Sequence, residues 1–346
     1  MSSSQPMSRR RPPTMADVAR TAGVSPATVS YVLNGRGGDS GAARISEETR
    51  DRVHAATRKI GYAVNESARS LRRNRTDRVL LLIDRLASPY EQRLAAELEE
   101  TLLASGRSLS IMVCTTLDRL ETALGLLRRR LADGAIVESR MVPGMQEVLE
   151  RVAGTSPIVA ISTSLGPNGF DVVASDEAPA LEDAITHLLD RGHRRFGFIA
   201  HDLGDAGEEP RLPIVQRRLS VDDLGIPPDL IVAGARDRVS AFAAARELLG
   251  RTGRPTALLS ASDIGAISAI WAAQSLGLRV PDDIAIVGVG NIAEGTITVP
   301  PLSSVGPVDP DFSSIATMLI ERLDATTTLE GRRLSVPWQF VARGSS

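Results

Sequence analysis

The sequence predicts a small all-α headpiece built on a helix-turn-helix, followed by a two-lobed α/β body with doubly wound parallel sheets. Two short helical patterns joined by a glycine turn occupy residues 14–34. After residue 78 the chain alternates short apolar runs with helical patterns. Residues 1–78 hold 15 Lys and Arg against 7 Asp and Glu, whereas the rest holds 25 against 35. Charge and pattern change at the same place, which indicates separate domains.

The first helical pattern carries local signals at both ends. Thr14 can cap it, and Asp17 three residues later completes a capping box at the positive end of the helix dipole. Gly23 suits the left-handed backbone that ends many helices. Ser25 then caps a second helix, and Pro26 fits its first position because no backbone donor is needed there. A second helix that starts so soon after the first predicts a helix-turn-helix corner.

A third helix is predicted after this corner. Ser46 caps it, Glu47 and Glu48 lie in its first turn, and Gly61 follows its last turn. Three helices can bury a small common core and leave the start of the second helix exposed, where a recognition helix meets base edges and phosphates of DNA. Any helical hairpin with a glycine turn shares this local pattern, so residues 14–34 alone leave a purely structural role open.

The body is predicted as two successive rounds of alternating strands and helices. Strands are expected over residues 79–83, 109–113, 134–137, 158–161, 196–200, 230–233, 257–260 and 284–289. Helices are expected over residues 91–104, 120–131, 144–151, 181–189, 212–219, 240–249 and 264–276. The continuous apolar run 79–83 is typical of a parallel strand that is buried on both faces. In such sheets ligands bind beyond the carboxyl ends of the strands, so two facing lobes predict a binding cleft.

Composition narrows the classes of protein further. A chain of 346 residues with 42% hydrophobic content can form two or three domains with a large core. Its one cysteine, Cys114, allows no internal disulfide, and its four histidines lack metal-ligand spacing, so neither a metal nor a cofactor is expected. The polar start and the absence of a long apolar run predict a cytoplasmic protein with no membrane contact.

Two stretches near the N-terminus carry a family resemblance. DVARTAGVSPATVSYVLNG (residues 17–35) and ISEETRDRVHAATRKIGYAVNESARSL (residues 45–71) resemble the DNA-binding headpiece and hinge of the lactose/galactose repressor (LacI-GalR) family. The loop between them, residues 36–44, is longer than the family pattern. The resemblance implies a disordered basic tail over 1–12, a headpiece over 13–64 and a hinge helix with linker over 65–78.

The resemblance also implies which residues contact a double-stranded operator: Thr14, Ser25, Pro26, Ala27, Thr28, Ser30, Tyr31 and Asn34 in the headpiece, with Asn65, Ala68 and Leu71 in the hinge. In the family pattern the hinge orders on DNA, and Leu71 would then wedge into the minor groove and kink the site. In many relatives the position of Tyr31 is an arginine that can pair with guanine, so Tyr31 predicts a different readout at that base step. Thr28, Ser30 and Asn34 are expected to hold phosphates, and Pro26 and Ala27 to make apolar contacts such as one with a thymine methyl.

Residues 79–343 resemble, more loosely, the periplasmic-binding-protein-like effector-binding and dimerisation core of the same family. The matching motifs are Ser88-Pro89-Tyr90, Asp133-Gly134, Val173-x-x-Asp176, Gly192-His193-Arg194-Arg195, Ser262-Asp263, Val280-Pro281-Asp282-Asp283-Ile284 and Pro300-Pro301-Leu302-Ser303-Ser304-Val305. This resemblance implies that a small-molecule effector contacts Ser88, Tyr90, Glu138, Ser139, Asp176, Arg211, Arg236, Ser262, Asp263, Gly290 and Asn291.

The predicted effector site departs from the family pattern at two positions. Gly290 stands where sugar-binding members usually have an Asp, and Arg236 takes the position of an aromatic residue that often stacks on a sugar ring. With Arg211 this gives two guanidinium groups and one carboxylate fewer, which favours an anionic ligand. A shifted alignment, or a cleft that no longer binds a ligand, would explain the same departures.

The sequence as a whole therefore predicts a DNA-binding transcriptional regulator, a repressor that binds a two-fold symmetric operator as a homodimer and responds to an effector between its lobes. A regulator of the same fold without a ligand is the first alternative. A solute-binding protein or a Rossmann-type enzyme is the remote one, because Gly288-x-Gly290 lacks the third glycine of a dinucleotide-binding loop and no nucleophile has a base nearby in the sequence. No enzymatic activity is expected.

Overall fold

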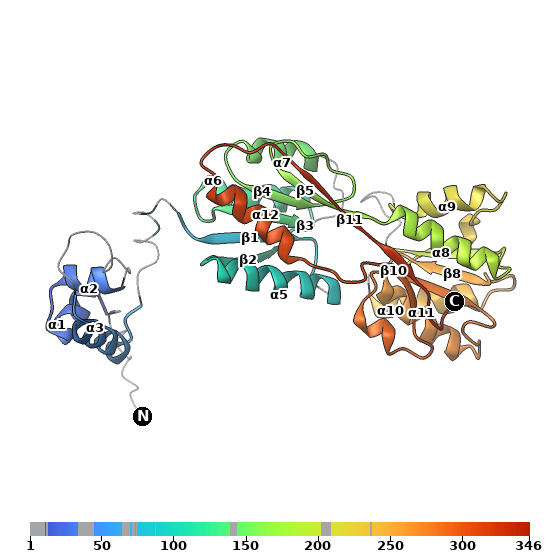
Figure 1. The fold of residues 1–346 in the computed structure, drawn as a ribbon. Helices are drawn as coiled ribbons and strands as arrows, with labels where there is room; N and C mark the ends of the chain where they lie inside the picture. The colour runs from blue at the N-terminus through green and yellow to red at the C-terminus, as the bar shows by residue number, and fades with distance from the viewer. Residues whose placement is uncertain are drawn as a thin grey trace, which may run out of the picture. The chain divides into compact units, whose positions relative to one another are not determined.

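The structure is a computed structural model of the chain, and it describes residues 11, 13–33, 45–63, 70, 73, 75–86, 88–138, 144–201, 209–235 and 237–346. The chain divides into two compact units, Met1–Thr76 and Asp77–Ser346 (Figure 1). The first unit is all-α and the second contains both sheets. The predicted fold class, an α-helical headpiece and a two-lobed α/β body with doubly wound parallel sheets, is confirmed.

The first unit is a three-helix headpiece made of α1 (Met15–Ala22), α2 (Pro26–Leu33) and α3 (Glu47–Ile60). Its helices begin and end where the sequence signals predicted. Their apolar faces meet in one small core that includes Val18, Val29 and Val53, none of which is exposed to solvent. This core is the source of headpiece stability, because each helix alone is too short to be stable in water.

The first lobe of the body, here called the N-lobe, is a six-stranded parallel sheet with the order β11-β5-β4-β3-β1-β2. Its strands are β1 (Arg78–Ile83), β2 (Ser108–Val113), β3 (Gly134–Glu138), β4 (Ile158–Ile161), β5 (Asp171–Asp176) and β11 (Arg333–Pro337). Helices α5 (Pro89–Ala104) and α12 (Ser313–Asp324) pack on one face. Helices α6 (Leu117–Arg128) and α7 (Met145–Ala153) pack on the other, so the central strands are buried on both sides.

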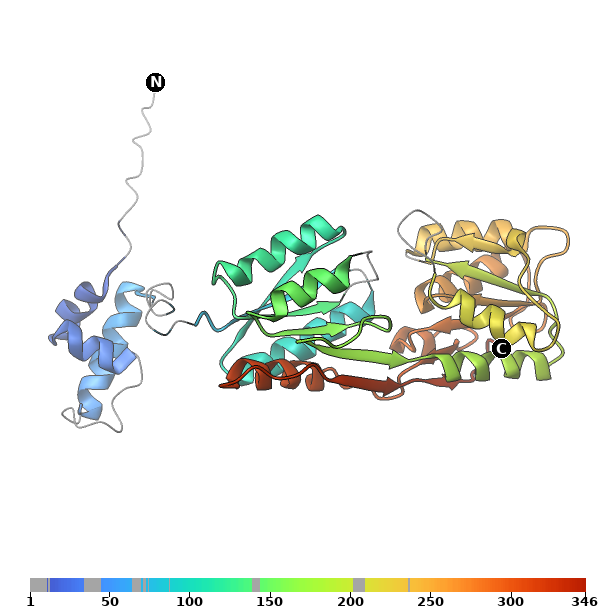
Figure 2. The same cartoon turned by 90° about the horizontal axis from the view of Figure 1, so that it is seen from above.

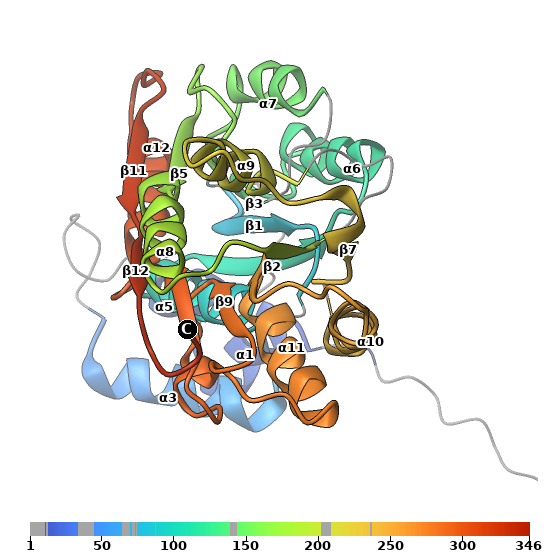
Figure 3. The ribbon, with the colours of Figure 1, turned by 90° about the vertical axis from the view of Figure 1, so that its right-hand side faces the viewer.

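The second lobe, the C-lobe, repeats this plan with the strand order β12-β10-β9-β8-β6-β7, in which β12 alone runs antiparallel to its neighbour. Its strands are β6 (Phe196–Ala200), β7 (Ile231–Ala233), β8 (Ala257–Ser260), β9 (Ala285–Val289), β10 (Ser303–Gly306) and β12 (Gln339–Val341). Its helices are α8 (Ala178–Asp190), α9 (Leu212–Ser220), α10 (Arg238–Leu249) and α11 (Asp263–Ser275), with 3-10 turns η1 (Pro228–Leu230) and η2 (Ala293–Thr296). Figure 3 shows α8 lying alongside β12.

Three connections join the two lobes. The first runs from β5 into α8, the second from β10 to α12 through residues 307–312, and the third from β11 to β12 through Trp338. The first and third connections lie side by side, as Figure 2 shows. They do so because β11 pairs with β5. Within the described residues no helix combines the length and apolarity needed to cross a bilayer.

Candidate nucleic-acid interface and effector site

The helix-turn-helix corner is fixed by local hydrogen bonds. The backbone N–H and the hydroxyl of Thr14 donate to Asp17 Oδ2 at 2.9 and 2.7 Å, and these bonds lower the pKa of Asp17. Gly23 has φ +67°, a conformation in which glycine avoids the steric cost of a side chain. The Ser25 hydroxyl then accepts a hydrogen bond from the backbone N–H of Thr28 at 3.1 Å. The corner is therefore set by the sequence of residues 14–28 itself.

The start of α2 presents short side chains and one aromatic ring. Val29 is fully buried in the headpiece core, which turns Ser25, Pro26 and Ala27 to solvent. Tyr31 is 43% exposed one turn later. Thr28 and Ser30 are half-buried, and the Thr28 hydroxyl lies 2.9 Å from that of Ser25. This is the surface that a recognition helix needs. The predicted contacts Asn34, Asn65, Ala68 and Leu71 lie outside the described residues, as does the loop 36–44.

On the N-lobe the predicted effector residues lie at or beyond the carboxyl ends of β1, β3 and β5. Ser88 caps α5, and its hydroxyl donates to Glu91, which in turn pairs with Arg85 at 3.0 Å. The Tyr90 ring meets Phe312 edge to face at 5.4 Å. Burial raises the pKa of Tyr90, and the negative charges of Glu138 and Glu91 add to the effect.

Arg211 at the start of α9 pairs with the carboxylate of Glu177 and lies over the Trp338 ring. Its Nε and Nη2 donate to Glu177 Oε2 at 3.0 and 2.8 Å, and its Nη1 donates to the Ala261 carbonyl at 3.2 Å. The guanidinium also lies 5.8 Å from the centre of the Trp338 ring. Burial would lower the pKa of Arg211, but Glu177 and Glu209 outweigh burial and raise it. Each of the three guanidinium nitrogens is thus hydrogen-bonded within the chain.

The remaining C-lobe candidates are also engaged internally. Ser262 caps α11 and donates to the Ala235 carbonyl at 2.6 Å. Asp263 accepts from the Ser304 hydroxyl at 2.6 Å and from the Ile292 N–H at 2.7 Å.

Asn291 is held from two sides. It donates to the Pro307 carbonyl at 2.8 Å and accepts from Arg343 at 2.6 Å. Together with Ser262 and Asp263, it makes this side of the predicted site a network that fixes the ends of β9 and β10.

Gly290 has a backbone that explains the missing aspartate. Its φ of +132° is a conformation that L side chains rarely adopt, so an Asp at this position would be strained. The departure from the family pattern is therefore built into the backbone. Of the three remaining candidates, Asp176 is exposed at the end of β5, whereas Ser139 and Arg236 lie outside the described residues.

Two residues in this region were missed by sequence reasoning. Glu177 was not predicted although it follows the predicted Asp176, and Trp338 was not among the predicted site residues. Glu177 lies 34 residues and Trp338 lies 127 residues from Arg211 along the chain. A local sequence pattern cannot predict contacts between residues so far apart.

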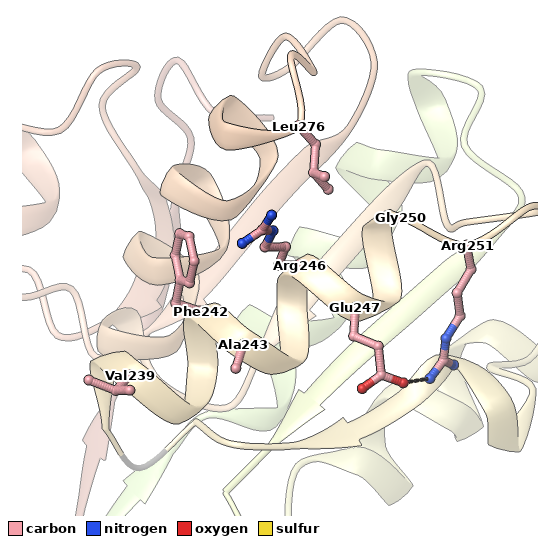
Figure 4. A pocket seen from close by; sticks show the side chains of 8 residues that line it. All are labelled: Val239, Phe242, Ala243, Arg246, Glu247, Gly250, Arg251 and Leu276. Atoms are coloured by element: carbon pink, nitrogen blue, oxygen red, sulfur yellow. Dashed lines mark hydrogen bonds and ion pairs between the residues drawn. The ribbon is translucent and has the colours of Figure 1, made fainter.

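A separate surface groove of about 650 Å³ lies between α10 and the end of α11 (Figure 4). Val239, Phe242 and Leu276 supply its apolar lining, and Arg246 projects into it. None of the predicted effector residues that the structure describes lines this groove, so it is distinct from the region around Arg211.

Comparison with known proteins matches both units. Residues 14–65 match the model described as bacterial regulatory proteins, lacI family, and residues 185–346 match a periplasmic binding protein-like domain. The transcriptional regulator DegA of Bacillus subtilis (strain 168) is 32% identical over 96% of this chain and 98% of its own length. The chain belongs to the lacI family.

Other relatives and structures agree with this assignment. The ribose operon repressor of Escherichia coli (strain K12) is 29% identical to this lacI-family protein over 96% of the chain and 99% of that repressor. The solved structure of the lac repressor dimer bound to operator and an anti-inducer has a TM-score of 0.79 at 24% identity, covering 97% and 99% of the two chains. The complex of the regulator CelR with cellobiose has a TM-score of 0.68 at 26% identity, covering 96% and 100%. The protein is a DNA-binding transcriptional regulator of this family and not an enzyme.

Proposed function

We propose that this lacI-family regulator represses transcription as a homodimer on a two-fold symmetric operator, and that a small molecule bound between the lobes modulates its affinity. The single observation that carries the DNA part is the exposed start of α2 on a capped and packed three-helix unit. Because its target is chromosomal DNA, we place its action in the cytoplasm. Binding should weaken as salt rises, because the basic headpiece displaces counterions from phosphate.

Tyr31→Arg is expected to change the preferred operator sequence. The side chain at this position is 43% exposed, and a guanidinium there could pair with guanine in two places, which a phenol cannot do. Selection of binding sites from random DNA should show a shift of about 1–3 kcal/mol in favour of guanine at one step of each half-site. Val221→Arg, at a 76% exposed position of the body, is the control. An unchanged consensus for Tyr31→Arg would refute contact between this residue and the bases.

The homodimer is supported by apolar side chains on one side of the body. Trp271, Ile297 and Val299 of the C-lobe are 42%, 79% and 80% exposed, and Arg238 stacks 5.6 Å from the Trp271 ring. Figures 1 and 3 show that α5 and β2 of the N-lobe lie on the same side as α10 and α11. The N-lobe elements expose Leu103, Ile111 and Val113. Exposed Trp, Arg and aliphatic groups of this kind are typical of the centre of a protein interface.

Trp271→Glu is expected to weaken dimerisation. Truncation of a central aromatic residue costs an interface about 2 kcal/mol or more, and the added carboxylate would also be desolvated. Sedimentation equilibrium should therefore show a dissociation constant raised by about 30-fold or more. Val221→Glu changes an exposed residue elsewhere on the body and should leave the constant unchanged. A wild-type protein that sediments as a monomer would exclude the homodimer.

The effector proposal rests on Arg211, whose guanidinium contacts Glu177 and Trp338 where the chain passes between the lobes. The expectation of an anionic ligand depends on Arg211, which already holds Glu177. We expect phosphate esters of sugars to raise the unfolding temperature of the body and their neutral parent sugars not to do so, as measured by thermal shift. Stabilisation by the neutral sugars and not by their phosphate esters would exclude an anionic effector.

A second candidate function has its own supporting observation. Each Arg211 nitrogen and both Asp263 oxygens form hydrogen bonds inside the chain. Such a site is stable without a ligand, which favours a regulator that binds its operator constitutively. In that case no compound of either class would shift the unfolding temperature.

A further inference from the structure

Two of the three connections between the lobes lie in contact with one another. Glu177 follows β5 where the chain leaves the N-lobe, and Trp338 separates β11 from β12 where the chain passes between the lobes again. The Trp338 N–H donates to the Asp176 carbonyl at 3.2 Å, so the two connections are joined by their backbones. Any change in the angle between the lobes must change backbone torsions in these segments.

Arg211 contacts both connections from the C-lobe. Its ion pair with Glu177 has an N–O distance of 2.8 Å, and its guanidinium stacks on Trp338. The side chains of Arg211 and Glu177 are only 17% and 6% exposed. A forked guanidinium that is bonded along one edge and stacked on a ring is fixed in both direction and distance. Movement of α9 relative to either connection would break these contacts.

The second connection is anchored in a different way. The Phe312 N–H donates to Glu97 of the N-lobe at 2.9 Å, and the Pro307 carbonyl accepts from Asn291 of the C-lobe at 2.8 Å. This connection is therefore tied to each lobe by a different side chain, Glu97 on the N-lobe and Asn291 on the C-lobe. At the first and third connections the single side chain of Arg211 makes both contacts.

We infer that Glu177, Arg211 and Trp338 form a latch that holds the two lobes in one arrangement without any ligand, with Glu177 and Trp338 as positioning residues for Arg211. Glu177 occupies the guanidinium edge that an anionic effector would need. An anion that bound Arg211 along the edge formed by Nε and Nη2 would displace Glu177 from the connection, and that displacement would open the latch. The latch contacts do not depend on the proposed function. The expected effect of the latch on operator affinity does rest on it.

The latch can be tested on the full-length protein with no compound added. The chain has two tryptophans, so the difference in emission between a protein and its Trp338→Phe form reports Trp338 while Trp271 of the proposed dimer surface stays in place. In the wild-type background Glu177→Gln removes the charge at nearly constant shape, and Arg211→Lys keeps the charge but removes the fork and the stacking. Asp222→Asn is the matched control, because it breaks the 2.6 Å pair that Asp222, just beyond the end of α9, forms with Arg218 of α9.

Both latch variants should shift Trp338 emission to longer wavelength, change the radius of gyration measured by X-ray scattering and alter ligand-free operator affinity by about 5-fold or more. Asp222→Asn should match the background protein in all three measurements. Emission and scattering equal to the background in both latch variants would overturn the inference. So would loss of folding in both of them, since the cluster would then be a stability element. Emission and scattering need no DNA, so failure to bind an operator would count against the proposed function alone.

Discussion

Val29→Asp is expected to abolish operator binding by the regulator while its body unfolds at the wild-type temperature. Val29 is fully buried between Val18 and Val53 in the only core that the headpiece helices share among the described residues. Burying a carboxylate there costs several kcal/mol, which is comparable with the whole stability of a domain this small. The headpiece should therefore unfold, and operator affinity should fall by about 100-fold or more.

Calorimetry and fluorescence anisotropy together check this result. The headpiece and the body form separate compact units, so we expect each to unfold in its own calorimetric transition. In Val29→Asp the headpiece transition should disappear and the body transition should remain. Val221→Asp places the same charge at a position that is 76% exposed, and it should change neither measurement. If Val29→Asp kept wild-type affinity, α2 could not be the element that reads DNA.

The headpiece was predictable because its signals are local. The capping box of Thr14 and Asp17, the left-handed Gly23 and the cap at Ser25 each act within three residues, and the structure contains all of them. With the corner fixed, the apolar faces of α1 and α2 pack against each other in the headpiece core. Here local conformation and burial agree, which is the condition under which sequence determines a fold most directly.

The body was predicted less completely because some of its elements depend on distant partners. Strand β5 begins at Asp171, whose buried carboxylate pairs with Arg322 at 2.7 Å and Arg332 at 2.9 Å from the far end of the chain. Strand β10 carries buried serines, and Ser303 receives hydrogen bonds from Arg343 and Ser346. Polar residues are expected to be exposed unless such partners are known, so β5 and β10 were not predicted.

The predicted effector site shows the same limit. The family pattern located Arg211 and Asp263, but it did not show that Glu177 and Ser304 already hold them. Whether a charged group is available to a ligand depends on partners that folding brings together. The positions of candidate residues could therefore be predicted from the sequence, and their availability could not.

Asp263→Asn is expected to remove a pH dependence from the stability of the body. Burial raises the pKa of Asp263 to about 6 from an ordinary value of 3.8, although hydrogen bonds from Ser304 and Ile292 oppose the shift. The folded protein thus binds this proton more tightly than the unfolded chain does. The stabilisation from this proton is complete below pH 3.8 and is lost as the pH rises through about 6.

Urea unfolding of both proteins between pH 4 and pH 7 measures the effect. Over this range the free energy of unfolding of the wild type should fall relative to that of Asp263→Asn by about 2 kcal/mol, because 1.36 kcal/mol accompanies each unit of pKa and part of the shift already lies below pH 4. Asp283→Asn is the control. Hydrogen bonds from Arg279 lower the pKa of Asp283, so its contribution changes below pH 3.8, outside the measured range.

The difference in the free energy of unfolding between the wild type and Asp263→Asn could instead stay constant with pH. That result would show that the carboxylate keeps one charge state throughout. The outcome bears on regulation because Asp263 holds the Ile292 N–H immediately before η2. In η2, Glu294 pairs with Arg238, the residue that stacks on Trp271 in the proposed dimer surface. If protonation of Asp263 loosens η2, the dimer of the wild type should weaken as the pH falls from 7 to 4. Dimerisation of Asp263→Asn should stay constant over this range.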